Sequence, residues 1–551
     1  MAQVAHLRLV VLALFFTAAV MLVIGRLAFL AAFSQSPTSR DGAAALVPLR
    51  ADVTDRNGVP LARTIDAWSV GVQPKNVIGD KAELARRLAT IFPERDATWF
   101  YTRLKMDAAF TYLATRALPA QVSAVNALGE PGIKFGREPQ RLYPQSSMAA
   151  HALGFLDIDG HGQRGMERFL EERLTDPATR DAPVALSIDA RVQAAMESEL
   201  GQAMVAFGAR GAAGLVLDVD TGEIVAMASL PVFNPNRIKG STADMQRNNV
   251  TQSVYELGSA FKPITMATAI ESGVVTNMAR RFDATAPLQV GRFRIKDDHA
   301  QNRWLNIPET LIHSSNIATA RIAEEIGPER LQATFRALDF DKRPAIELRE
   351  KQKSLWPQYW ARTTTMTTAF GHGIAVTPLH LASAYAALVN GGIFRPATLL
   401  KVAPGQAVAG KRVYSQATSD RLRQLLRLIV TQGTGKKAEA PGYRVGGKTG
   451  TAEVPGRGGY DKNRNVSTFA AVFPMDHPRY VVIAMVDSAQ RVEANSYQTT
   501  AAYTAAPVIS RVIMRTGAIL GVMPDVRRDV DVSDLTPLLW HAPGEDPAAG
   551  E

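Results

Sequence analysis

Residues 9–24 (LVVLALFFTAAVMLVI) form an uncharged apolar run, and no other feature constrains the fold as strongly. Beyond Arg26 the apolar character continues to Phe33. A membrane-spanning helix needs about 20 apolar residues, which 9–33 supplies if the Arg26 side chain reaches the far headgroups. A cleaved signal peptide is the alternative, but its apolar core is usually about 7–15 residues. We therefore predict an uncleaved anchor at 9–33, preceded by a cytoplasmic tail at 1–8 and followed by exported domains.

The composition excludes several classes of protein. A chain of 551 residues is too long for one ordinary domain. The net charge of +10 suits a nucleic-acid binder, but Lys and Arg are spread along the chain without a basic run, so we predict no nucleic-acid partner. The absence of cysteine excludes disulfides, thiolate metal sites and a cysteine nucleophile. The nine histidines show no H-x-x-x-H spacing, so we expect neither metal nor cofactor.

The part of the chain nearest the anchor carries no catalytic pattern. Residues 34–182 mix strand-like and helix-like segments with frequent proline and glycine joints. A helix is predicted after Asp80, with Glu83 three residues later as a capping box. We interpret 34–182 as a mixed, elongated pedestal domain.

The second domain, 183–524, begins and ends with strand pairs. Gly214–Met227 alternates apolar residues around a turn, and 466–473 with 479–486 do so again. Helix-like stretches such as Pro378–Leu388 lie between the two pairs. This order predicts an α+β domain in which an antiparallel sheet is closed by non-sequential strands and flanked by helices. From Asp525 to Glu551 the chain is rich in Asp, Pro and Gly and is predicted to be a flexible tail.

Ser259 is the only serine with lysine three residues later, in Gly258-Ser259-Ala260-Phe261-Lys262-Pro263. Residues i and i+3 share a helix face, so the two side chains can meet. Proline is tolerated only in the first helical turn, which predicts that the helix begins at about Ser259. There the helix dipole favours a developing oxyanion and opposes a charge on Lys262. Alone this spacing is weak, because a helix-capping serine and a surface lysine would be the better explanation.

Two further motifs strengthen the interpretation. Ser314-Ser315-Asn316 lies 55 residues beyond Ser259, although a polar turn before a helix would look the same. Lys448-Thr449-Gly450-Thr451 contains the only K-T-G, and as an edge strand it would present an ammonium and two hydroxyls to an anion. A turn explains this alternation poorly. By contrast 433–437 only superficially resembles a phosphate-binding loop and is predicted to be a turn.

S-x-x-K, S-x-N and K-T-G in this order are the signature of penicillin-binding proteins and related β-lactamases. The chain resembles the class B penicillin-binding proteins of the cell-division type over nearly its whole length. The other matching stretches are Arg50-Ala51-Asp52, Asp55–Gly58, Arg141–Pro144, His151–Gly154, Gly165–Glu167, Arg247-Asn248, Glu256, Phe370–Gly373 and Val376–Pro378. Leu257 and Phe261 depart from the family pattern, and we expect both to alter the entrance to the site and the choice of β-lactam.

The resemblance implies a serine D-Ala-D-Ala transpeptidase that joins stem peptides of peptidoglycan at the division septum. Ser259 would attack the carbonyl between the two D-alanines while Lys262 takes its proton. Ser314 would relay the proton to the leaving amine, and Asn316 would hold the substrate amide. The oxyanion would be bound by the backbone N–H groups of Ser259 and Thr451, each typically contributing ~2.7–4 kcal/mol.

The resemblance further implies that Lys448 provides positive potential and that Thr449 and Thr451 bind the terminal carboxylate, with Gly450 allowing close approach of the substrate. β-Lactams would acylate the same serine. It implies a single-pass protein of the inner membrane with a periplasmic catalytic domain, whose partners are a membrane glycan polymerase and other division proteins. The acceptor would be an amine of a neighbouring strand.

Several alternatives share these motifs. A serine β-lactamase would need a base that activates water, and the predicted anchor and pedestal argue against it. A D,D-carboxypeptidase is poorly separated by sequence. An elongation-type relative usually ends the second motif in Asp, and a bifunctional enzyme would need an upstream glycosyltransferase region. A septal scaffold with a vestigial pocket would not need all the motif residues.

Overall fold

The computed structural model describes residues 14–23, 49–456 and 459–540 and separates into two compact units. The first unit contains Thr64–Gln140 and the segment up to Leu49, and the second contains Arg50–Arg63 and the chain from Arg141 onward. Residues 14–23 are helical, but no helix in the described part of the chain has the length and apolar character needed to span a membrane. The rest of the predicted anchor, like the predicted tail at 1–8, lies outside the described residues.

The first unit packs three helices on an antiparallel sheet. Its elements are β2 (Pro60–Val72) from Thr64 onward, α2 (Lys81–Ile91), α3 (Ala97–Leu104), β3 (Thr111–Ala117), α4 (Pro119–Asn126) and β4 (Ile133–Leu142) as far as Gln140. The Asp80 side chain caps α2 by accepting the N–H of Ala82, as predicted. Glu83 pairs with Arg86 and Arg87, so the capping box is not formed.

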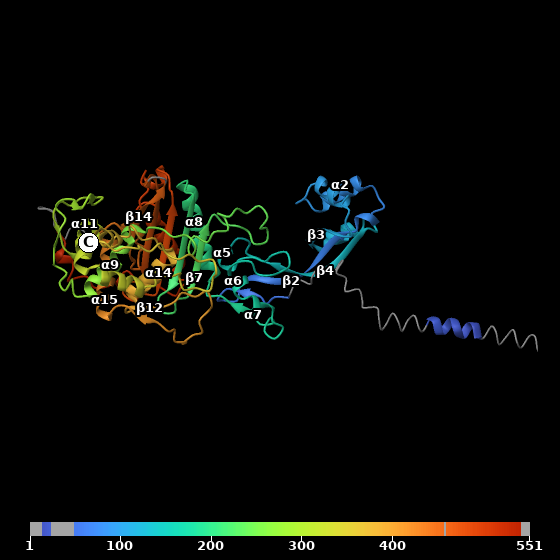
Figure 1. The fold of residues 1–551 in the computed structure, drawn as a ribbon, viewed down its shortest axis with the longest axis horizontal. Helices are drawn as coiled ribbons and strands as arrows, with labels where there is room; N and C mark the ends of the chain where they lie inside the picture. The colour runs from blue at the N-terminus through green and yellow to red at the C-terminus, as the bar shows by residue number, and fades with distance from the viewer. Residues whose placement is uncertain (1–13, 24–48, 457–458, 541–551) are drawn as a thin grey trace, which may run out of the picture. The chain divides into compact units, whose positions relative to one another are not determined.

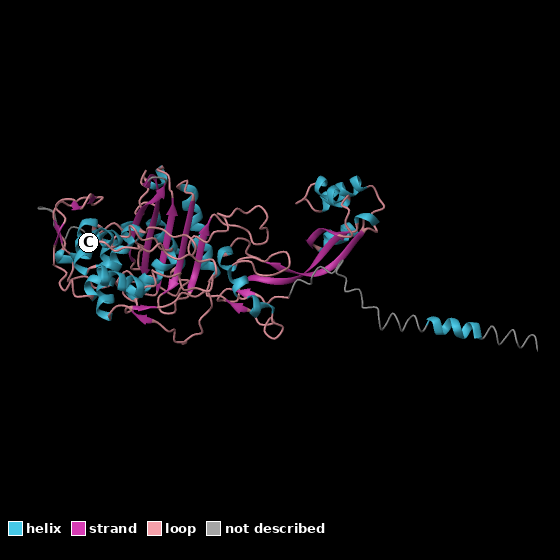
Figure 2. Ribbon diagram, in the orientation of Figure 1, coloured by secondary structure: helices cyan, strands magenta, loops and turns pink. Residues whose placement is uncertain are grey.

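The second unit is built on a five-stranded antiparallel sheet (Figure 2). Its strands run in the spatial order β14 (Gly446–Gly456), β15 (Gly459–Phe473), β16 (Tyr480–Asp487), β6 (Gly211–Asp218), β7 (Ile224–Leu230). Both predicted hairpins are present, and β16 pairs with β6 although more than 260 residues separate them in the chain. The predicted α+β sheet domain with non-sequential closure is therefore confirmed.

Alternation along the strands divides the core into two layers. Leu215 and Ile483 face one core, whereas Val216 and Val482 face the other. Six helices contribute to these two layers. The first core is covered by α9 (Lys262–Glu271), α11 (Asn316–Ile326), α14 (Pro378–Val389) and α15 (Gln416–Thr431), and the second by α8 (Ala190–Ala206) and α16 (Ala505–Thr516) (Figure 1).

The predicted flexible tail begins at Asp525, but its described part, from Asp525 to Trp540, is packed against the second unit. Both carboxylate oxygens of Asp529 accept from Arg427 Nε, at 2.9 and 2.8 Å, and Leu535 is fully buried. The apolar residues of this segment are few, but they cover the first core beside α15. The remainder of the predicted tail lies outside the described residues.

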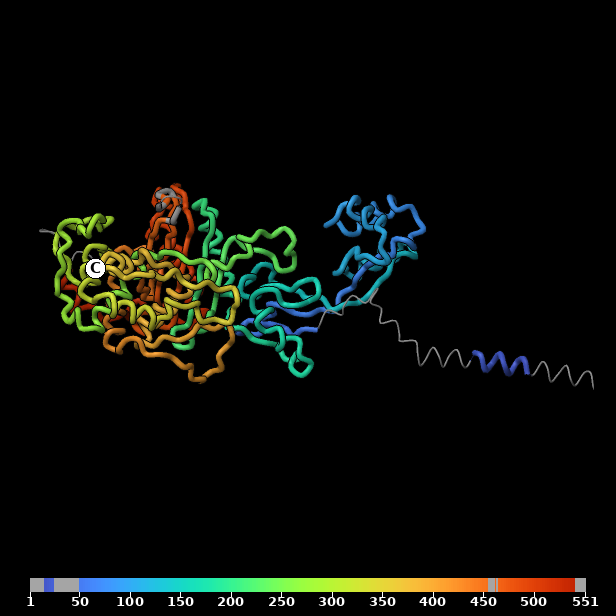
Figure 3. Tube along the Cα trace, in the orientation of Figure 1, coloured from blue at the N-terminus to red at the C-terminus, as the bar shows by residue number. Residues whose placement is uncertain are grey.

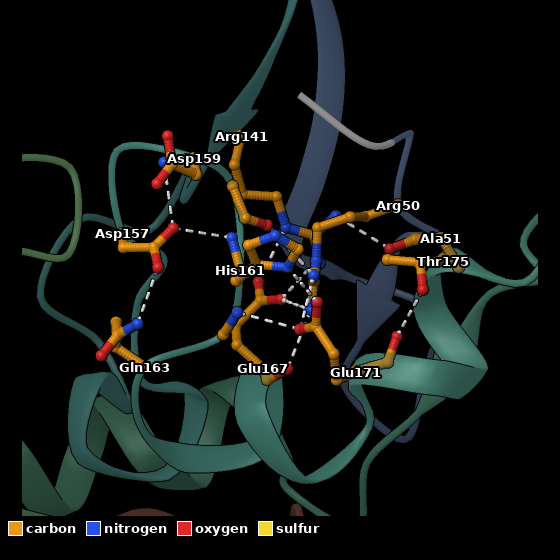
Figure 4. Close-up of polar contacts among 12 residues, drawn as sticks. Arg50, Ala51, Arg141, Asp157, Asp159, His161, Gln163, Glu167, Glu171 and Thr175 are labelled. Atoms are coloured by element: carbon orange, nitrogen blue, oxygen red, sulfur yellow. Dashed lines mark hydrogen bonds and ion pairs between the residues drawn. The ribbon is translucent and has the colours of Figure 1, made fainter. Parts of the chain in front are cut away.

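A buried ion network joins the start of the second unit to the helices α6 (Gly165–Phe169) and α7 (Glu171–Thr175) (Figure 4). Glu167 accepts from Nε of Arg50 at 3.1 Å and from Nε of Arg141 at 2.7 Å, and all three side chains are almost inaccessible. Arg50 also donates to Glu171 at 2.7 Å. Three of the quoted family motifs thus meet in one structural cluster.

Glu167→Ala should strongly destabilise the protein, because it leaves two buried guanidinium groups without their shared carboxylate. Breaking a buried ion pair typically costs about 3–5 kcal/mol. Chemical denaturation followed by fluorescence measures the effect. Glu172→Ala removes an exposed carboxylate from the adjacent helix and should change stability by no more than about 0.5 kcal/mol. Equal effects of the two substitutions would contradict a stabilising role for the network.

Candidate active site

Ser259 lies in a 3₁₀ turn, Gly258–Phe261, which leads directly into α9 at Lys262. Pro263 occupies the first turn of α9, as predicted, and the helical region begins within one residue of Ser259. Gly258 has a φ of +53°, and a Cβ there would lie 2.8 Å from the carbonyl oxygen of Thr451. Glycine therefore permits both the turn and the close approach of β14 to the partly accessible Ser259.

Lys262 is fully buried, and its ammonium contacts the second motif. Nζ donates to Ser314 Oγ at 3.1 Å and to the Ser314 carbonyl oxygen. Burial lowers the pKa of Lys262 to about 7, although the negative charges of Asp297 and Asp298 oppose this shift. In the described part of the chain, no hydrogen bond joins Nζ to Ser259 Oγ. The lysine thus stands on the same helical turn as Ser259 and is oriented by Ser314.

The second motif is held at the start of α11. Ser314 adopts a φ of +57°, and Ser315 caps the helix by accepting the N–H of Ala318. Asp297 accepts hydrogen bonds from Ser315 Oγ at 2.7 Å and from the N–H groups of Asn316 and Ile317. Asp297 was missed by the sequence analysis, because no pattern links it to a motif 17 residues further on.

Asp297→Ala should slow acylation by roughly tenfold, because about 1–2 kcal/mol of charge-assisted hydrogen bonding at this helix start is lost. Asp297→Asn, which keeps one acceptor oxygen, should be affected less. The acylation rate with a chromogenic β-lactam measures this. Asp244→Ala removes an exposed carboxylate elsewhere in the same unit and serves as control. A wild-type acylation rate for Asp297→Ala would show that Ser314-Ser315-Asn316 keeps its geometry without Asp297.

The K-T-G motif lies on β14, the predicted edge strand, beside the turn of Ser259. Nζ of Lys448 donates to Thr449 Oγ1 at 3.0 Å. Burial, and then the nearby Lys262, hold the pKa of Lys448 well below its usual range. A Cβ on Gly450 would lie 2.3 Å from the Leu257 carbonyl oxygen, so this glycine serves the packing of β14 on the turn. Thr451 Oγ1 accepts the N–H of Ala501 at 3.0 Å.

Two other segments complete the site. Of the turn predicted at 433–437, residues 433–435 form a turn, whereas a 3₁₀ helix, Lys436–Ala438, begins at Lys436. Thr434 Oγ1 lies 2.9 Å from Thr449 Oγ1, a contact that the sequence did not reveal. The backbone of Gly371 packs on Gly258, and the next residue, His372, places Nδ1 3.5 Å from a carboxylate oxygen of Glu256. Burial lowers the pKa of His372, while the charge of Glu256 opposes this change. Both residues lie in stretches that resemble the family, but their contact is not evident from the sequence.

Leu257 and Phe261 are not at the entrance, contrary to expectation. Both side chains are fully buried, and the ring of Phe261 packs against Phe335 and Phe340 at centroid distances of 5.7 and 5.4 Å. The side chain points into the core beneath α9 because neighbours on a helical turn face different sides. These residues therefore support the turn from below.

The arrangement brings together Ser259, Lys262, Ser314 and Lys448, residues that lie as much as 189 positions apart in the sequence. A partly accessible hydroxyl at a helix start, beside a buried amine with a pKa near neutrality, is suited to nucleophilic acyl transfer. Within the described residues, no group of His, Cys, Asp and Glu could hold a metal ion. The fold and site define the class of serine acyltransferases.

Comparison with known proteins agrees with this class. Residues 212–513 match the penicillin binding protein transpeptidase domain, and residues 45–176 match the penicillin-binding protein dimerisation domain. The chain therefore belongs to the penicillin-binding protein transpeptidase family.

Individual relatives are similar over most of their length. The chain is 40% identical to a probable peptidoglycan D,D-transpeptidase FtsI of Caulobacter vibrioides, covering 86% of this chain and 82% of the relative. It is 30% identical to the peptidoglycan D,D-transpeptidase FtsI of Escherichia coli K12, covering 88% and 86%. Penicillin binding protein 3 of Mycobacterium tuberculosis, solved with aztreonam, matches with a TM-score of 0.68 and 26% identity over 87% of this chain and 97% of that one.

Proposed function

We propose that this protein is a peptidoglycan D,D-transpeptidase that cross-links stem peptides at the division septum through an acyl-enzyme on Ser259, and that β-lactams inhibit it by acylating the same residue. One observation carries the proposal. The buried ammonium of Lys262, one helical turn from Ser259, is hydrogen-bonded to Ser314 Oγ at 3.1 Å. This contact supports the assignment of Lys262 as the base for Ser259 and of Ser314 as the proton relay.

Acylation follows from these positions. Neutral Lys262 takes the proton of Ser259 Oγ, and the oxygen bonds to the carbonyl carbon between the two D-alanines. The N–H groups of Ser259 and Thr451 hold the resulting oxyanion. The proton passes through Ser314 to the nitrogen of the terminal D-alanine, and the C–N bond breaks. This leaves an ester on Ser259 and releases D-alanine.

The remaining motif residues position the donor peptide. Asn316, held by Lys296 and Asp297, would bind the peptide amide. Lys448 supplies positive potential, and Thr449 and Thr451 would bind the terminal carboxylate. Lys448 donates to both the hydroxyl and the carbonyl oxygen of Thr449, which supports the orientation of that hydroxyl.

The second half of the reaction needs an amine from a neighbouring strand. Its neutral nitrogen attacks the ester carbonyl of the acyl-enzyme, and a new amide bond forms as the bond to Ser259 Oγ breaks. The proton lost by the nitrogen returns to Ser259 through Lys262. If water attacks instead, the outcome is a D,D-carboxypeptidase reaction, which is the second candidate function.

The organisation of the chain completes the proposal. Residues 1–8 would be cytoplasmic and 9–33 would anchor the protein in the inner membrane, with the pedestal at 34–182 and the transpeptidase domain at 183–524 on the periplasmic side. The family resemblance supports a membrane glycan polymerase and other division proteins as partners.

Product analysis distinguishes the two functions. The purified protein is incubated with a stem pentapeptide donor and an excess of an amine acceptor, and the products are identified by mass spectrometry. We expect an acceptor adduct that is lost with Ser259→Ala. Exclusive hydrolysis of the donor at saturating acceptor would favour the carboxypeptidase.

A further inference from the structure

A two-stranded hairpin beside the second motif exposes a cluster of cations and an aromatic ring. The hairpin consists of β9 (Leu288–Val290) and β10 (Phe293–Ile295). Phe293 is 53% exposed, and the guanidinium of Arg292 lies 5.2 Å from the centre of its ring. Arg294 is also exposed. The hairpin pairs with no other strand in the described part of the chain, so its outer surface is open to a ligand.

The hairpin leads directly to the second motif. The carbonyl oxygen of Lys296, the residue after β10, accepts a hydrogen bond from the side-chain amide of Asn316 at 3.0 Å. The next residue, Asp297, accepts from Ser315 and from the N–H groups that begin α11. A ligand on this hairpin therefore lies only a few residues from Ser314 and Asn316.

A second group of aromatic residues, Trp304 and Trp540, lies near His313, the residue before Ser314. The guanidinium carbon of Arg303 is 4.9 Å from the ring centre of Trp540. Nη2 of Arg303 is 3.4 Å from Nε2 of His313. Trp304 and Trp540 are 54% and 56% exposed. The backbone N–H of Trp540 donates to Glu309, which also pairs with Arg303. The C-terminal segment is thus bound beside the active site and contributes a half-exposed indole.

We use the term basic aromatic surface for Arg292, Phe293 and Arg294 on the hairpin that leads to the contact with Asn316, together with Arg303, which contacts His313, its neighbour Trp304, and Trp540. Among the described side chains, neither Arg292 nor Arg294 forms an ion pair. Unpaired guanidinium groups bind carboxylates in bidentate geometry, and exposed aromatic faces offer large apolar area to a ligand. The combination suits a ligand that carries both sugar rings and carboxylates.

We propose that the basic aromatic surface binds the uncross-linked peptidoglycan strand that supplies the acceptor amine, with the aromatic rings under its sugars and the arginines on its stem-peptide carboxylates. This inference rests on the proposed function. The donor carboxylate is assigned to Lys448, Thr449 and Thr451 on β14, whereas this surface adjoins Ser314 and Asn316. A peptidoglycan strand bound here would direct its peptide amine towards the acyl-enzyme from the side of Ser314 and Asn316.

The test compares two charge reversals of equal size. Arg292→Glu with Arg294→Glu alters the surface, and Arg237→Glu with Lys239→Glu makes the same change in charge and spacing on another exposed loop of the unit. Figure 3 shows the chain near residue 290 and near residue 240 at opposite ends of this unit. Trp304→Ala tests the aromatic contribution. The readouts are sedimentation with purified uncross-linked peptidoglycan strands and the rate of acylation by fluorescent penicillin.

We expect the surface variants to lose at least about tenfold in affinity for the strands, and added salt to weaken wild-type binding. The control should bind normally, and all variants should acylate within about twofold of wild type. Unchanged binding would overturn the inference, as would a parallel loss of acylation, which would make the surface a support for the second motif. Binding to anionic lipid vesicles with the same residue dependence, but not to strands, would overturn it in favour of a membrane contact. Absence of penicillin acylation in the wild type would instead refute the proposed function.

Discussion

Ser259→Ala should abolish covalent labelling by fluorescent penicillin, with intact-mass analysis showing no adduct. The acyl-enzyme needs an oxygen at this position, and alanine has none. The substitution removes one oxygen from a partly accessible side chain, so the free energy of unfolding should change by less than about 1 kcal/mol.

Ser272→Ala is the matched control for this prediction. Ser272 follows the other end of α9, and the chemical change is the same. This variant should label at the wild-type rate, and peptide mapping of its adduct should find Ser259. Persistent labelling of Ser259→Ala would refute the assigned nucleophile, and mapping would then identify the serine that replaces it.

Lys262→Met should slow acylation by roughly 10²–10⁴-fold, the usual contribution of a general base. Methionine has nearly the length of the lysine stem and carries no charge, so the buried position should stay filled. Stopped-flow acylation with a chromogenic β-lactam measures the rate. Circular dichroism establishes that the variant is folded.

The pH dependence of the acylation rate provides a second test of Lys262 as the base. Only neutral Lys262 accepts a proton, and burial lowers its pKa to about 7. The wild-type acylation rate should therefore rise as the pH increases through about 7 and level off above it, and Lys262→Met should lose this step. Near-normal acylation of Lys262→Met would indicate another base. Lys448, whose pKa is also lowered by burial, is the first to test, by Lys448→Met.

Local features of the sequence were sufficient for much of the fold. The alternation in Gly214–Met227 predicted the β6–β7 hairpin, because successive side chains of a strand point to opposite faces of its sheet. Both strands prove to be buried on both faces. Pro263 located the start of the helix next to Ser259. Proline has no backbone N–H, and only in the first helical turn does the N–H have no partner within the helix. The predicted loose tail from Asp525 failed for 525–540, since a few apolar residues and one ion pair with Arg427 bind a segment whose composition resembles that of a linker.

The supporting residues of the site were beyond local inference. Asp297, Thr434 and the contact of His372 with Glu256 come from separate loops, and nothing in the spacing of the three motifs identifies them. The fully buried position of Phe261 was likewise unforeseen. A residue between two motif positions was expected to border the site, yet the helical turn directs it to the opposite side.

By itself the sequence determined the order S-x-x-K, S-x-N, K-T-G, the helix start beside Ser259 and the antiparallel hairpins, all of which depend on residues close together in the chain. The tertiary structure alone decided that Lys262 is oriented by Ser314, that Asp297 secures the second motif, and that Gly258 and Gly450 allow β14 to approach the turn of Ser259. The physical reason is burial. The pKa of a lysine and the geometry of a hydrogen bond depend on what surrounds them, and here those surroundings come from distant parts of the chain.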